Sequence, residues 1–75
     1  MLRNHYLVED YEMMADHLDN LMNQLLKTQE CATKGDFTQR DNIIASINHS
    51  MLMLQALNAK KTQREAIESG RLQSI

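Results

Sequence analysis

A row of carboxylates is the part of this chain whose residue types and spacing could bind a metal ion. Steps of three, four and three residues, which place side chains on one surface of a helix, separate Glu9, Glu12, Asp16 and Asp19. Di-metal carboxylate bundles also need inward-facing Glu-x-x-His motifs on paired helices, and the sequence contains no such motif. We therefore interpret the row as a solvated acidic face that a basic partner could recognise, and we predict no metal and no cofactor.

The other nucleophiles and bases do not form a catalytic pattern either. No His-x-x-x-His or Cys-x-x-Cys spacing connects the histidines and the single cysteine, which are His5, His17, His49 and Cys31. Ser50 follows His49 directly, and adjacent residues of a helix do not face one another. Cys31 could act as a nucleophile only beside a base placed by the fold, so we interpret it as a small apolar residue. The sequence therefore predicts that the protein is not an enzyme.

Length and composition limit the fold to one small domain, residues 1–75. A core of this size rarely supplies more than about 3–5 kcal/mol. A single cysteine excludes an intrachain disulfide and fits a reducing compartment. Proline is absent and glycine occurs only twice, which favours a mostly helical chain. We therefore expect the domain to gain stability by associating with a second copy or with a protein partner, and we predict a homo-oligomer.

Charge and hydropathy bear on location and partners. The N-terminal segment MLRNHYLVEDYEMM lacks the unbroken apolar stretch of a signal peptide, and no run approaches the length of a membrane span. We therefore expect a cytoplasmic protein without membrane contact. The net charge is −2, with seven acids and three bases in residues 1–36 against three acids and five bases in residues 37–75. Such opposite poles suit antiparallel or head-to-tail association, and the basic excess is too small to indicate nucleic-acid binding.

Heptad spacing predicts a long first helix from about residue 5 to residue 33. Alternating steps of four and three residues give it one seam, formed by Leu7, Tyr11, Met14, Leu18, Leu21, Leu25, Thr28 and Ala32. The acidic row falls on the side of the helix opposite this seam. A helix with this pattern must bury its seam against another helix.

A turn at residues 34–37 ends the first predicted helix. Gly35 is the residue that a helix favours at its C′ position, where φ is positive, and Lys34 suits the negative end of the helix dipole. Asp36 or Thr38 can cap the helix that follows. The sequence therefore predicts a tight connection between two antiparallel helices.

The second helix is expected from about residue 38 to residue 58 or beyond. Its seam consists of Ile44, Ile47, Met51 and Leu54, flanked by Ile43 and Leu57. The polar tail to residue 75 could extend this helix, form a short third helix or fray. The predicted fold class is all-α: an antiparallel helical hairpin that packs as a dimer or against a partner helix.

Several large apolar residues exceed what a bare hairpin would bury. We predict that they bind protein, and they are Met13, Leu26, Met51, Leu52 and Met53. A surface that is simply rather apolar, or an offset in the predicted register, would also account for them. A second apolar face, buried by a dimer or by a partner's helix, is the alternative that methionine favours, because its flexible side chain repacks against varied partners.

Two family resemblances bear on function. The plan of a long helix, a Gly-Asp turn and a second helix resembles type III secretion co-chaperones and the hairpin of flagellar export chaperones. The residues that carry this resemblance are the segment ATKGDF at residues 32–37, followed by Ile43, Ile44 and Ile47. It implies a small bacterial protein that shields an aggregation-prone export substrate by offering the substrate's helix an apolar groove.

The second half of the chain also resembles the small biofilm and acid-resistance regulators of enteric bacteria. The matching residues are Gly35-Asp36, Asn42-Ile43-Ile44, Ser46, His49-Ser50 and Arg64. This resemblance implies an all-helical dimer that acts through protein contacts, with DNA as a further ligand. The longer heptad helix of the first half departs from that family, and the net acidity argues against a DNA role.

From these observations we predict a non-enzymatic protein-interaction module. The leading hypothesis is a small export chaperone or co-chaperone that shields a partner helix. The alternative is a small helical regulator of biofilm or stress responses that acts by binding protein or DNA.

Overall fold

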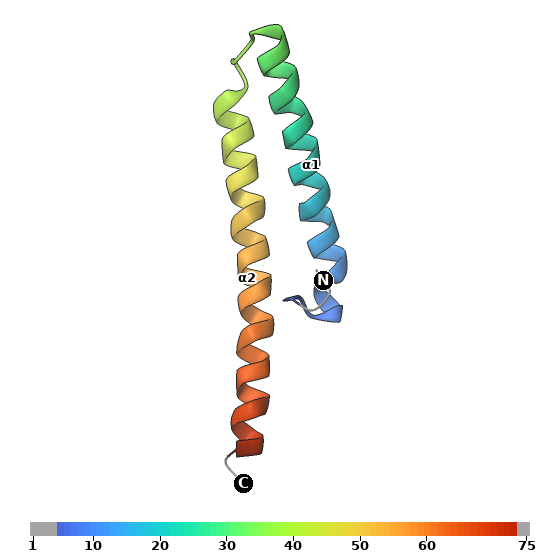
Figure 1. Cartoon of the computed structure of the whole chain (residues 1–75), viewed down its shortest axis with the longest axis vertical. Helices are drawn as coiled ribbons and strands as arrows, with labels where there is room; N and C mark the ends of the chain where they lie inside the picture. Colours follow the sequence, from blue (N-terminus) through green and yellow to red (C-terminus); the bar gives the residue numbers. More distant parts are fainter. Residues whose placement is uncertain (1–4, 74–75) are drawn as a thin grey trace.

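Two antiparallel helices form this protein, as a computed structural model of the chain shows for residues 5–73 (Figure 1). A short 3-10 helix, η2 (Val8–Asp10), leads into helix α1 (Tyr11–Lys34), and helix α2 (Arg40–Gln73) returns along α1. The molecule is elongated, with extents of 62 × 18 × 16 Å. The predicted all-α hairpin is confirmed.

Helix α1 begins at Tyr11, later than the expected start near residue 5. Leu7, which fits the heptad, is instead extended, with φ −73° and ψ 147°. The backbone N–H of Asp10 donates to the Leu7 carbonyl at 2.9 Å, which closes η2. The side chain of Asn58 in α2 donates to the carbonyl of His5 at 2.9 Å, so this segment contacts α2 instead of extending α1.

The connection between the helices depends on the conformation of Gly35. This residue has φ 67° and ψ 26°, the left-handed region predicted from the sequence, and its N–H donates to the Cys31 carbonyl. Asp36 does not cap α2, because its Oδ1 accepts hydrogen bonds from the N–H and hydroxyl of Thr38, at 3.1 and 2.8 Å. These bonds lower the pKa of the Asp36 carboxyl. Gln39 precedes α2 and accepts the N–H of Ile43 at 2.9 Å.

Alanine substitutions at the two glycines are expected to have opposite effects. Gly35→Ala should cost about 1–2 kcal/mol, because an L-residue is strained in the left-handed region. A Cβ at this position meets nothing within 4 Å, so the cost comes from the backbone alone. Gly70 lies within α2, where alanine should add about 0.5–1 kcal/mol. Urea unfolding followed by circular dichroism measures the change in stability of both variants. Changes of the same sign would contradict this account of the turn.

Helix α2 continues well past residue 58 and ends at Gln73. Of the three alternatives for the polar tail, an extended second helix, a short third helix or fraying, the structure shows the first. It has 34 residues against 24 in α1, so its C-terminal part extends beyond the N-terminus of α1 (Figure 1). Within residues 5–73 no separate third helix follows it. Residues 74 and 75 of the predicted tail lie outside the described residues.

At three positions, two in α2 and one in α1, the buried residue is the neighbour of the one that the heptad predicted. In α2, Ile43 and Ser50 are 6% and 1% exposed, whereas Ile44 and Met51, which the heptad placed in the seam, are 51% and 55% exposed. In α1, Gln24 is buried and Leu25, the predicted seam residue, is exposed. The shared apolar core combines Met14, Leu54 and Leu57 with the partly buried Tyr6, Tyr11, Leu18 and Leu21.

A hydrogen-bonded polar cluster explains this register. The Nδ2 of Asn20 donates to the hydroxyl oxygens of Ser46 and Ser50, at 3.0 and 2.8 Å. The Oδ1 of Asn20 accepts from Gln24 at 3.2 Å, and His17 Nδ1 lies 3.1 Å from Ser50 Oγ. Polar groups can be buried at low cost when they satisfy one another. The seam therefore holds them, and larger apolar side chains remain on the flank.

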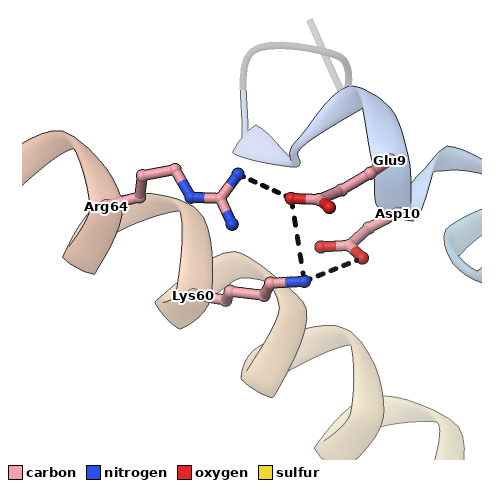
Figure 2. Close-up of polar contacts among 4 residues, drawn as sticks. All are labelled: Glu9, Asp10, Lys60 and Arg64. Carbon is pink, nitrogen blue, oxygen red and sulfur yellow. Dashed lines mark hydrogen bonds and ion pairs between the residues drawn. The ribbon is translucent and has the colours of Figure 1, made fainter.

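A charge cluster joins η2 to the far part of α2 (Figure 2). Lys60 Nζ lies 3.2 Å from Asp10 Oδ1 and 3.9 Å from Glu9 Oε1, and Arg64 forms an ion pair with Glu9. Glu9 is exposed, as predicted for the acidic row, but it lies in η2 and pairs with residues of α2, apart from the acids on the outer side of α1. The acidic N-terminal part and the basic part of α2, predicted as opposite poles, pair within one hairpin.

A double-mutant cycle measures the Glu9–Arg64 pair. Both side chains are about half exposed, so the coupling energy between Glu9→Gln and Arg64→Gln should be only about 0.2–1 kcal/mol. It should shrink as salt is raised, because exposed charges are screened. The same cycle on Glu30 and Lys34, an exposed ion pair within α1, gives the reference value. A coupling that is insensitive to salt would contradict this assignment.

Candidate protein-binding face

One flank of the hairpin carries several large apolar side chains, which we call the lateral face. Its members come from both helices and are Leu18, Met22, Leu25, Ile44, Met51 and Leu52. Leu25 follows Leu18 by seven residues, and Ile44 precedes Met51 by seven, so each pair lies on one side of its helix. Because the helices are antiparallel, the two rows run side by side toward the turn.

An open groove of about 490 Å³ lies in the part of the lateral face that is farther from the turn. Its apolar lining residues are Tyr6, Leu18, Leu21, Met51, Leu52 and Leu54. Its polar lining residues are three amides: Asn48, Gln55 and Asn58. None of these lining residues is charged. The groove can therefore accept an apolar side chain and offer hydrogen bonds at its edge, as helix-in-groove recognition requires.

The structure divides the five residues predicted to bind protein. Met51 and Leu52 line the groove, and Leu26 is exposed beside Leu25. Met13 and Met53 do not line the groove. Their places follow from those of His17 and His49, whose rings form an edge-on pair with centroids 5.9 Å apart. Met13 is four residues before His17 and Met53 four after His49, so each lies one helical turn from that pair.

Other members of the lateral face were assigned to the seam in the sequence analysis. All three fit the heptad, namely Leu18, Leu25 and Ile44. Leu18 keeps its partly buried place against the core, whereas the spacing did not show that a hydrogen-bonded polar row displaces Leu25 and Ile44. The sequence feature that could have indicated this register is Asn20, a polar residue between the seam residues Leu18 and Leu21. That residue becomes informative only when its partner on α2 is known.

His17 and Ser50 approach each other as a base and a nucleophile would, although they are 33 residues apart in the sequence. Their separation of 3.1 Å is within the reach of a general base. The hydroxyl of Ser50 is nevertheless enclosed between the helices and also accepts a hydrogen bond from Asn20. A substrate cannot reach an oxygen in that position, so we interpret this contact as part of the polar cluster.

A second groove, of about 540 Å³, lies on the polar side near the turn. Cys31 lines it together with several charged residues: Lys27, Glu30, Lys34 and Asp36. Glu30 and Lys34 form an ion pair at 2.7 Å, which lowers the pKa of Glu30 and raises the pKa of Lys34. Cys31 is partly buried, and no base is hydrogen-bonded to it among the contacts of the described residues.

Neither comparison with known proteins nor the grouping of side chains identifies a ligand for the described part of the chain. No protein-family model, curated protein or solved structure matches this chain. Among residues 5–73, no group of three or more histidine, cysteine or acidic side chains could hold a metal ion. No helix in this part of the chain is long and apolar enough to cross a membrane.

Proposed function

We propose that this protein is a non-catalytic binding module whose lateral face takes up a helix of a protein partner. The observation that carries the proposal is the exposure of Leu25, Ile44, Met51 and Leu52 on one side of an otherwise complete hairpin. Contiguous apolar surface of this kind marks interaction sites in soluble proteins. An amphipathic helix is the partner that an open, mostly apolar groove without charged lining residues fits.

The same features support an export chaperone or co-chaperone as the particular role. A chaperone of this kind keeps the apolar helix of another protein covered, and this hairpin offers two parallel apolar rows for that purpose. Methionines at positions 22 and 51 let the surface adapt to the shape of its client. Nucleic-acid binding has less support, because Lys60 and Arg64 are already paired with acidic residues of η2.

A photo-crosslinking amino acid in place of Met51 tests the proposal in the cell of origin. We expect it to capture a specific protein, which is then purified and titrated with the wild-type hairpin. The double variant Ile44→Gln, Met51→Gln should bind this partner about thirtyfold more weakly or worse, because buried amides would lack hydrogen bonds.

The matched control is Met13→Gln, Ile67→Gln, which also replaces one methionine and one isoleucine that are about half exposed. Both of its positions lie off the lateral face, so its affinity should equal that of the wild type. Equal binding by the two double variants would refute the proposal. An exported protein as partner supports the chaperone role, whereas a transcription or signalling protein would assign the regulator role instead.

A further inference from the structure

We infer that a second copy of this chain covers the lateral face, so that two hairpins form a four-helix homodimer when no other partner is bound. This inference rests on the proposed function, because it names a further occupant of the same face. A partner helix would then exchange with the second copy. The evidence is the exposed area of the single hairpin and the charge of the face.

The single hairpin exposes more surface than a chain of its mass normally does. Its accessible area is 6041 Å² for a mass of 8.7 kDa, whereas the scaling for compact monomers gives about 4,700 Å². The radius of gyration is 17.1 Å, against about 11 Å for a compact domain of this length. A standard interface removes about 800 Å² from each partner. The excess of roughly 1,300 Å² is therefore large enough for one such interface.

The lateral face is also suited to contact a copy of itself. In a twofold dimer each residue near the axis lies close to the same residue of the other copy, so a charge there would meet its like. The lateral face and the lining of its groove consist of apolar and amide side chains without any charge. The amide groups of Asn48 and Gln55 can both donate and accept hydrogen bonds, so two copies can satisfy one another.

The opposite flank lacks this property. Several charged residues line its groove near the turn, Lys27, Glu30, Lys34 and Asp36 among them, and a twofold axis there would bring like charges together. The outer side of α1 carries exposed acids at Glu12, Asp16 and Asp19, which two copies would also bring together. Charge therefore selects the lateral face as the surface that two copies share.

Sedimentation equilibrium on the purified chain at about 1–100 µM tests this inference without any partner. We expect the wild type to form a dimer and Ile44→Gln, Met51→Gln to dissociate about thirtyfold more readily or worse. The control Met13→Gln, Ile67→Gln should dimerise as the wild type does. The apolar swap Ile44→Leu, Met51→Leu should also retain the dimer, which separates loss of apolar contact from loss of side-chain shape.

The outcomes separate the two proposals. A wild type that stays monomeric at the highest concentration, or a lateral-face variant that dimerises as tightly as the control, overturns the homodimer. If the glutamine variant loses its helical circular dichroism, the single exposed change Ile44→Gln is measured in its place and must weaken the dimer. A confirmed dimer whose crosslinker captures no other protein would instead refute the proposed function and leave the homodimer standing.

Discussion

Replacing Ile43 with alanine is expected to lower the free energy of unfolding by about 2–4 kcal/mol. Ile43 is a buried residue on the side of α2 that faces α1, and the change leaves a cavity that its neighbours fill only in part. Since a core of this size supplies about 3–5 kcal/mol, the variant should lose most of the stability of the hairpin. Urea unfolding at one fixed protein concentration, followed by circular dichroism, gives the value.

Ile67→Ala is the matched control for this experiment. It makes the same change in the same helix at a residue that is more than half exposed, so stability should change by less than about 0.5 kcal/mol. The heptad prediction placed Ile44 in the seam and Ile43 beside it. If Ile43→Ala costs no more than the control, the packing of α2 against α1 described above is incorrect.

Replacing Asn20 with alanine is expected to cost about 1–3 kcal/mol. Its amide donates to Ser46 and Ser50 and accepts from Gln24, so its loss leaves buried polar groups without partners. Asn23→Ala, three residues further along α1 at an exposed position, removes the same side chain without breaking these bonds. Its effect should stay below about 0.5 kcal/mol. Equal effects in urea unfolding would show that the polar cluster contributes nothing to stability.

The sequence was sufficient to predict the helical hairpin and its turn. Heptad spacing is a local property of each helix, and the requirement for glycine at position 35 follows from the backbone alone. The start of α1 was less predictable, since Leu7 fits the heptad. The chain leaves the helix there because Glu9 and Asp10 pair with residues of α2 that are 55 and 50 positions away.

The register of the seam could not be predicted from hydrophobic spacing. Apolar residues occupy two neighbouring rows on α2, so burying Ile43 or Ile44 is equally consistent with the pattern. What decides between them is that Asn20 meets Ser46 and Ser50, which are 26 and 30 residues away. Part of the lateral face was missed for the same reason. Its residues were assigned to the core, and only the geometry between helices shows that they remain exposed.

The hydrogen-bonded serines also determine which movements the hairpin can make. A slide of α2 by seven residues, nearly two helical turns, would bring Ile43 or Leu57 opposite Asn20 in place of Ser50. The amide would then lose its acceptor, so sliding of one helix along the other, a movement that other helical switches use, is penalised here. The two helices therefore behave as one rigid body. A helix that bound as proposed would meet a preorganised surface, and little conformational entropy would be lost within the hairpin on binding.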